Sequence, residues 1–316
     1  MANERFYSLS KLGFGRHVIA LKCPTFLSCR TLATILMTDK SQYLDALIEV
    51  DKKYSKEVDL SNKPIFELLV ITSFIKALEI NLIINKEAFQ DNSFLFLSNL
   101  RGTCEELITL KFLHEKFDET DRNTLIDKIS RLQLENDILK QFDFLQKYRP
   151  FQPTIPPINQ AENPKNKINE ILSRNGISTK NKLPPTEQMA RMIGFSEFYE
   201  FMYRACSSFV HFKPGILLRT VWYDNQNVGN ISISNLNKYY WDFSSFYGVY
   251  QFLVLYKEFK SIIDINNILT SEIDILKESF KSRHFPEVIT FEELNIKRPK
   301  TKWTVVNLFL KNQLFE

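Results

Sequence analysis

The segment from Arg204 to His211 holds two side chains that together can act on a phosphate group. On an α-helix, seven residues make two turns less about 20°, so both side chains leave the same face, with Ser207 and Ser208 between them. Arginine binds phosphate oxygens as a forked cation, and histidine gains or loses a proton near neutral pH. The spacing therefore predicts a phosphate site in which Arg204 stabilises charge, His211 acts as general acid or base, and Ser208 adds a hydrogen bond.

A second polar pair lies about a hundred residues earlier in the chain. Arg101 and Glu105 are one turn apart on an expected helix that begins at 91–93 and ends near 117. Pairs at this spacing form an ion pair within their own helix, or they line a site when the helix faces one. Both interpretations remain open from the residues alone.

Together the two segments resemble a known family. Arg204, six further residues and His211 are similar to the Arg-x4–6-His signature of HEPN-domain proteins. More narrowly, Tyr203-Arg204…Ser208-Phe-Val-His211, preceded by Arg101-Gly-Thr-Cys-Glu105-Glu-Leu, is similar to an uncharacterised helical family of prokaryotic HEPN relatives. The resemblance covers roughly residues 60–260.

The resemblance implies a helical bundle that dimerises and brings two Arg/His motifs into one cleft. It implies cleavage of RNA without a metal ion or other cofactor, and a role as a toxin or in phage defence. RNA and a second copy would be partners, as would an antitoxin or a defence-system protein. Arg101 and Glu105 would lie on the neighbouring core helix and line the same site. The residue after the arginine is usually polar in active HEPN enzymes, whereas here it is Ala205.

Two other functions fit the same residues. Ala205 favours a non-catalytic HEPN-like scaffold that binds RNA, a nucleotide or a partner protein. The aromatic stretch 239–252 and a long proline-rich loop favour a purely structural subunit of a larger helical assembly. In that case Arg204 and His211 form a polar seam on a core helix, and the serines between them donate to backbone carbonyls one turn earlier.

Composition narrows the class of protein. The 27 phenylalanines supply a core, whereas only 8 glycines in 316 residues argue against sandwiches, barrels and glycine-rich nucleotide loops. The net charge of +4 permits nucleic-acid binding without requiring it. Four cysteines without a CxxC pair predict reduced thiols, and the scattered histidines predict no metal site. Because no run of about 18 apolar residues occurs, we expect a cytoplasmic protein without a membrane span.

The positions of apolar residues follow a helical period over most of residues 41–285. The helix that carries Arg204 and His211 is expected over 197–211, with Pro214-Gly215 as its end and a β-hairpin over 216–234. We therefore predict a mainly α fold, a HEPN-like helical bundle with a small β-hairpin insertion. Further helices are expected at 64–84, 91–117, 121–148 (as one or two helices), 186–193, 237–263 and 270–284.

The same pattern divides the chain into three parts. Residues 1–36 contain a single acid and no clear period, which predicts a flexible N-terminal extension. Residues 37–285 form the predicted helical HEPN-like domain, and a long proline-rich loop over 150–186 interrupts it, with a short helix near 167–173. Residues 286–316 are expected to form a C-terminal tail with a short helix.

Overall fold

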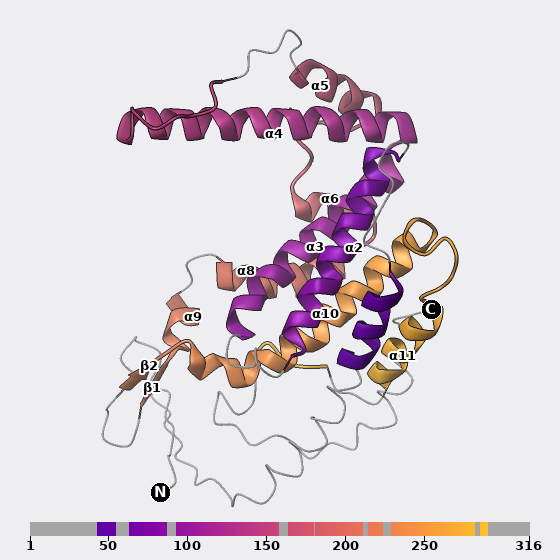
Figure 1. The fold of residues 1–316 in the computed structure, drawn as a ribbon, viewed down its shortest axis with the longest axis vertical. Helices are drawn as coiled ribbons and strands as arrows, with labels where there is room; N and C mark the ends of the chain where they lie inside the picture. Colours follow the sequence, from indigo (N-terminus) through magenta and orange to yellow (C-terminus); the bar gives the residue numbers. More distant parts are fainter. Residues whose placement is uncertain are drawn as a thin grey trace, which may run out of the picture. The chain divides into compact units, whose positions relative to one another are not determined.

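The computed structural model describes residues 43–54, 63–86, 93–157, 164–179, 181–210, 214–223, 229–281 and 285–289. Within them the protein is mainly helical, as the sequence predicted (Figure 1). The predicted N-terminal extension over 1–36 and nearly all of the predicted tail over 286–316 lie outside the described residues. None of the described helices has both the length and the apolar content needed to cross a membrane.

Residues 43–53 are helical, and the named elements follow along the chain. They are α2 (Ile65–Ile84), α3 (Ser93–Lys116), α4 (Glu119–Tyr148), α5 (Pro164–Arg174), α6 (Thr186–Met192), α7 (Ser196–Phe198), the π-helix η3 (Tyr199–Tyr203), α8 (Arg204–Val210), α9 (Pro214–Leu218), the strands β1 (Val221–Tyr223) and β2 (Gly229–Ile231), α10 (Ser234–Ile263) and α11 (Thr270–Lys281). The two strands pair antiparallel, with Val221 opposite Ile231.

The chain divides into two compact units, and α2 and α3 each contribute to both. The first unit comprises Met1–Val58, Ser73–Cys104 and Glu200–Glu316, and it contains α8, α10 and α11. The second comprises Asp59–Thr72 and Glu105–Tyr199, and it contains α4, α5 and α6.

The core of the first unit forms where α2 packs against α10. Phe74 of α2 stacks on Phe252 of α10 with 4.9 Å between the ring centroids, and both side chains are fully buried. Trp241 of α10 donates its indole N–H to a backbone carbonyl near the end of α2, at 2.9 Å from Ile84 O. Because the indole N–H has a partner, the large aromatic ring is buried without an unsatisfied donor.

The ends of α10 and α11 in this unit are tied by charged residues. Asp264, which follows α10, accepts the hydroxyl of Tyr256 at 2.6 Å and the backbone N–H of Ile268 at 2.8 Å. Lys53 from the helical residues 43–53 donates to Glu272 of α11 at 2.5 Å. These contacts hold three helices of the unit together.

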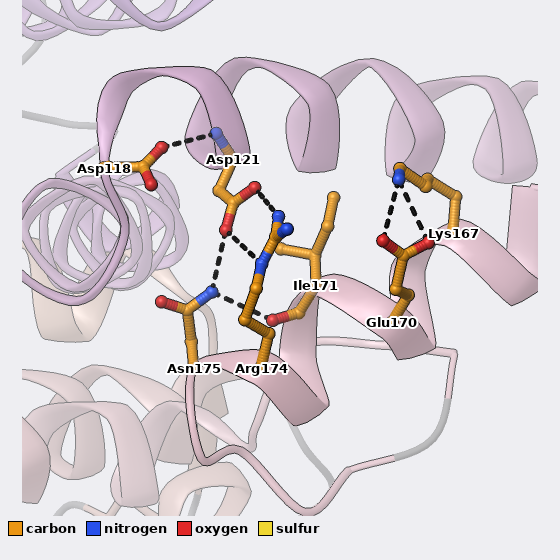
Figure 2. Close-up of polar contacts among 7 residues, drawn as sticks. All are labelled: Asp118, Asp121, Lys167, Glu170, Ile171, Arg174 and Asn175. Carbon is orange, nitrogen blue, oxygen red and sulfur yellow. Dashed lines mark hydrogen bonds and ion pairs between the residues drawn. The ribbon is translucent and has the colours of Figure 1, made fainter.

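The second unit is anchored at the start of α4. Asp118 caps this helix by accepting the N–H of Asp121 at 2.8 Å. The carboxylate of Asp121 then accepts Nε of Arg174 at 3.1 Å and Nδ2 of Asn175 at 3.0 Å, which fastens the end of α5 to the first turn of α4 (Figure 2). Asp121 is buried, so these donors offset the cost of removing its carboxylate from water.

Several predicted boundaries were wrong around the Arg204 helix. The helix expected over 197–211 is divided into α7, η3 and α8. Pro214-Gly215, expected to end a helix, instead begins α9, because proline is favoured in a first helical turn, where its missing N–H is not needed. The first residues of the expected 216–234 hairpin are therefore helical.

The predicted proline-rich loop over 150–186 contains a regular helix. The short helix expected near 167–173 is α5, and it extends from Pro164 to Arg174. Its buried residues, Ile168, Ile171 and Leu172, recur at helical spacing. The segment is therefore partly an element of the second unit rather than only a connection.

Candidate functional site

Arg204 is the first α-helical residue after a five-residue π-helical turn, η3. A π-helix bonds residue i to i+5, and this wider turn changes which side chains face each neighbour; such turns are frequent at functional sites. Tyr203 is the last residue of η3 and Arg204 the first of α8. The change in helix type therefore occurs at the start of the Arg204–His211 motif.

Tyr203 brings the arginine of α3 to this point. Nη2 of Arg101 donates to the hydroxyl of Tyr203 at 2.7 Å, and Cζ of Arg101 lies 4.8 Å from the centroid of the same ring. The half-buried guanidinium thus has a hydrogen bond and a cation–π contact with one side chain. Arg101 of α3 therefore contacts the residue that directly precedes Arg204 in the chain.

Aromatic contacts hold α8 between α3 and α10. The ring of Phe209 lies 5.7 Å from that of Phe94 on α3 and 4.9 Å from that of Tyr240 on α10, edge to face in both cases. Phe94 and Arg101 on α3 meet Phe209 and Tyr203 in the opposite order along the chain. The two helices therefore run antiparallel, and α8 is fixed on two sides within the first unit.

The side chain of Arg204 is at the surface. Its Nε lies 3.0 Å from Oε2 of Glu200 one turn earlier, and the two side chains are 54% and 52% exposed. An exposed pair of this kind contributes little to stability, so a ligand phosphate can compete with Glu200 for the guanidinium. Ser208 donates its hydroxyl to the carbonyl of Arg204 at 3.3 Å.

Glu105 lies one turn after Arg101 on α3, in the part of that helix that belongs to the second unit. Its Oε1 accepts the hydroxyl of Thr186, the first residue of α6, at 3.4 Å. Of the five predicted site residues, the structure therefore groups Arg101, Arg204 and Ser208 around α8. It gives Glu105 a contact of its own, and His211 lies outside the described residues.

The two residues that follow Arg204 on α8 are apolar or buried. Ala205, the residue after Arg204, is half-buried. Cys206 is fully buried, and this burial raises the pKa of its thiol to about 12. The thiol therefore stays protonated near neutral pH and is not a nucleophile here.

A comparison with family models gives a match over residues 68–228, just over half of the 316-residue chain, to a family of unknown function, DUF5677. The chain belongs to the DUF5677 family. Comparison with curated proteins and with solved structures gave no match. The DUF5677 region begins within α2 and ends between β1 and β2, so it contains α3, η3 and α8 with all the candidate site residues.

Two charged residues of the first unit were missed by the sequence analysis. Glu200, the partner of Arg204, lies in the DUF5677 region, and its spacing of four residues from Arg204 is a signal that was present in the sequence. Arg219 lies with Cζ 5.1 Å from the ring of Tyr240 and donates to the carbonyl of Val288 at 3.2 Å. No local pattern in the sequence indicates these contacts of Arg219.

The polar side chains described around α8 offer arginine, hydroxyl and carboxylate groups. Among the residues that the structure describes, no three His, Cys, Asp or Glu side chains are grouped closely enough to hold a metal ion. Guanidinium groups on two packed helices can bind the oxygens of one phosphate, or of neighbouring phosphates, in a planar two-point geometry.

Proposed function

We propose that this DUF5677 protein is a metal-independent endoribonuclease of the HEPN type. The observation that supports the proposal is the contact of Arg101 with Tyr203, which holds a second guanidinium against the residue that precedes Arg204. RNA offers a phosphate at every linkage, and arginines on a rigid helical scaffold are suited to hold it.

The proposed reaction is an internal transfer at one phosphate of RNA. The ribose 2′-hydroxyl loses its proton to a base, and its oxygen attacks the adjacent phosphorus. The bond from phosphorus to the 5′-oxygen breaks, and that oxygen takes a proton, which leaves a 2′,3′-cyclic phosphate and a 5′-hydroxyl. His211 exchanges the protons as general acid or base. Arg204 stabilises the charge that develops on the phosphoryl oxygens.

The other candidate residues have supporting roles in this proposal. Arg101, held by Tyr203, orients the phosphate, and Ser208 turns its hydroxyl from the carbonyl of Arg204 toward a phosphate oxygen. Glu105 would help to orient the guanidinium of Arg101, one turn before it on α3. Two copies of the chain would join their motifs in one cleft, and an antitoxin or a partner from a phage-defence system would control the activity in the cytoplasm.

A non-catalytic scaffold is the second candidate, and specific contacts favour it. Arg204 is already paired with Glu200, and Ser208 is bonded backward to its own helix. Ala205 offers no polar group that could orient the pair. A protein of this kind would bind RNA, a nucleotide or a partner protein at α8 without cutting RNA.

The test is cleavage of total RNA by the purified full chain in the presence of EDTA. We expect Arg204→Ala and His211→Ala to lower the cleavage rate by about 10²–10³-fold and 10²–10⁴-fold, through loss of charge stabilisation and of proton transfer. Arg191→Ala is the matched control, because Arg191 of α6 is also exposed and paired with a glutamate four residues earlier, Glu187. This control variant should cut RNA at the wild-type rate.

The outcomes separate the two candidates. If the His211→Ala variant cuts RNA at the wild-type rate, the ribonuclease proposal is wrong. Binding of RNA without cleavage, weakened in Arg204→Ala but not in Arg191→Ala, would establish the scaffold instead. In the ribonuclease, Ala205→Asn should raise the rate, because a polar neighbour would help to orient Arg204 and His211.

A further inference from the structure

Phe201 exposes an aromatic ring beside the arginine of the candidate site. It lies in η3, three residues before Arg204, and its side chain is 44% exposed. Two other apolar residues of η3, Tyr199 and Met202, are buried. The exposed residues of η3 and α8 are Glu200, Phe201, Arg204 and Val210. Phe201 is therefore the one exposed aromatic side chain of η3 and α8.

A buried ring holds Phe201 from one side. The centroid of the Phe201 ring lies 5.3 Å from that of Tyr247 on α10, with the two planes tilted by 58°. Tyr247 is buried, and its hydroxyl donates to the carbonyl of Pro286 at 3.0 Å. Because this supporting ring is fixed, ordering the Phe201 side chain against a ligand costs little conformational entropy.

Phe201 also shares a face of the helix with polar groups of the site. Phe201, Arg204 and Ser208 follow the spacing i, i+3, i+7, which places side chains on one side of a helix. The helix changes type after η3, yet the ion pair between Glu200 and Arg204 at 3.0 Å shows that side chains four residues apart meet across this change. Residues three apart lie about 5–6 Å apart at Cβ. One nucleotide can therefore touch both the Phe201 ring and the Arg204 guanidinium.

Charge alone gives this surface little affinity for RNA. Glu200 and Arg204 are the charged residues among the exposed ones of η3 and α8, and their charges cancel. Nucleic-acid binding through phosphates alone depends on several basic side chains. An exposed aromatic ring adds a contact that needs no net charge, because the π-face of any base can stack on it.

We propose that Phe201 stacks on a base of the bound RNA while Arg204 holds the phosphate of the same nucleotide. The inference deepens the proposed function and rests on the binding of RNA at α8. Neither contact reads the sequence, because every base has a π-face and every linkage has a phosphate. Together the two contacts place one phosphate of the strand at Arg204, whichever base the nucleotide carries.

The test is the Kd for a labelled single strand of about 8–16 nucleotides, measured by fluorescence anisotropy on the full chain. The strand is 2′-O-methylated, so it lacks the hydroxyl that the proposed cleavage requires. Phe201→Ala and Phe201→Leu should each raise the Kd by about 5–150-fold, the usual loss for one base–aromatic stack. Phe201→Leu keeps an apolar side chain against Tyr247, and Phe201→Trp, which keeps an aromatic face, should bind with a Kd near the wild-type value.

Two controls make the effect specific to a base. A strand of the same length built from abasic units keeps the phosphates, so Phe201→Ala should leave its Kd unchanged, whereas Arg204→Ala should weaken the binding of both strands. Phe144→Ala is the matched protein control, because Phe144 of α4 is also exposed and also lies against a tyrosine ring, that of Tyr148 at 4.8 Å. This variant should bind both strands as the wild type does.

The outcomes separate this inference from the ribonuclease. If Phe201→Ala binds the base-bearing strand as the wild type does while Arg204→Ala binds it weakly, the stacking is wrong and the binding of RNA at α8 stands. Equal losses on both strands would mean that Phe201 only supports the fold of η3, and a wild type that does not bind the strand at about 100 µM also excludes the stacking. A loss confined to the base-bearing strand supports the stacking even if the chain cuts no unmodified RNA, in which case the ribonuclease alone fails.

Discussion

α10 and α4 are both 30 residues long, yet they are stabilised in different ways. From Tyr240 onward α10 is largely buried, and two of its polar groups have partners on or just after α2: Ser245 donates to Oδ1 of Asn85 at 2.6 Å, and the carbonyl of Gly248 accepts Nδ2 of Asn81 at 3.1 Å. On α4 beyond its first two turns, the ion pairs lie within the helix itself, as in Arg131 with Asp127 at 2.9 Å.

The difference shows where helical stability comes from in this protein. Exposed ion pairs within one helix each contribute about 0.3–0.5 kcal/mol, whereas each large side chain buried on α10 contributes about 1.5–3 kcal/mol. Two helices of equal length therefore contribute unequally to the free energy of unfolding. Substitutions on α10 should change the free energy of unfolding of the first unit strongly, and those at exposed positions in the second half of α4 should change the free energy of unfolding little.

The largest expected effect compares one phenylalanine from each helix. Phe252→Ala removes a fully buried ring that stacks on Phe74, and it should lower the free energy of unfolding by about 3–5 kcal/mol. Phe144→Ala removes a ring that is 59% exposed and touches Tyr148 one turn later, so the loss should stay below about 0.5 kcal/mol. Urea unfolding gives both values, and similar losses for the two variants would contradict this comparison.

The comparison also separates what the sequence could predict from what it could not. The apolar spacing predicted a helix over 64–84, where α2 extends from Ile65 to Ile84, and a helix over 91–117, where α3 extends from Ser93 to Lys116. Residues that favour a helix start, or polar residues, lie at the ends of both helices. The α4 region was expected as one or two helices over 121–148, and the structure has one, from Glu119 to Tyr148.

At the candidate site the local signals were not sufficient. A π-helical turn leaves no apolar period of its own, so η3 was missed and the helix over 197–211 was drawn as continuous. The contact of Arg101 with Tyr203 joins residues 102 positions apart in sequence, and no local pattern indicates it. The pairing of Arg204 with Glu200 could have been found, because a glutamate four residues before an arginine is a helical pair.

A smaller effect is expected from a matched pair of glycines. Gly248→Ala on α10 would place Cβ 2.5 Å from Oδ1 of the buried Asn81, so the Asn81 side chain or the packed helices must shift, at a cost of about 1–3 kcal/mol. Gly102→Ala on α3 meets no atom within 4 Å and should instead stabilise the helix by about 0.5–1 kcal/mol. Thermal unfolding should shift in opposite directions, and a stabilising Gly248→Ala would mean that α2 and α10 are less tightly packed than described.

The smallest effect concerns the ion pair between Lys53 and Glu272, which is partly screened because the lysine side chain is 40% exposed. Burial alone would raise the pKa of Glu272, but hydrogen bonds from Lys53 and Ser271 outweigh it, and the net effect is a lowered pKa. A carboxyl group with a lowered pKa stabilises the fold above its unfolded pKa of about 4.3, and this contribution is lost as the pH falls through the folded value.

The unfolding midpoint in urea should therefore fall more steeply from pH 7 to pH 3 in the wild type than in Glu272→Gln, which has no carboxyl group to protonate. At pH 7, Glu272→Gln should be less stable than the wild type, and the two should converge in acid. Asp137→Asn on α4 is the matched control: it breaks the Lys140–Asp137 pair, whose side chains are 78% and 75% exposed, and it should change the midpoint at pH 7 little. Parallel pH profiles for the wild type and Glu272→Gln would show that Lys53 does not hold the carboxylate in solution. The charged contact that ties residues 43–53 to α11 would then be no stronger than the exposed pairs of α4.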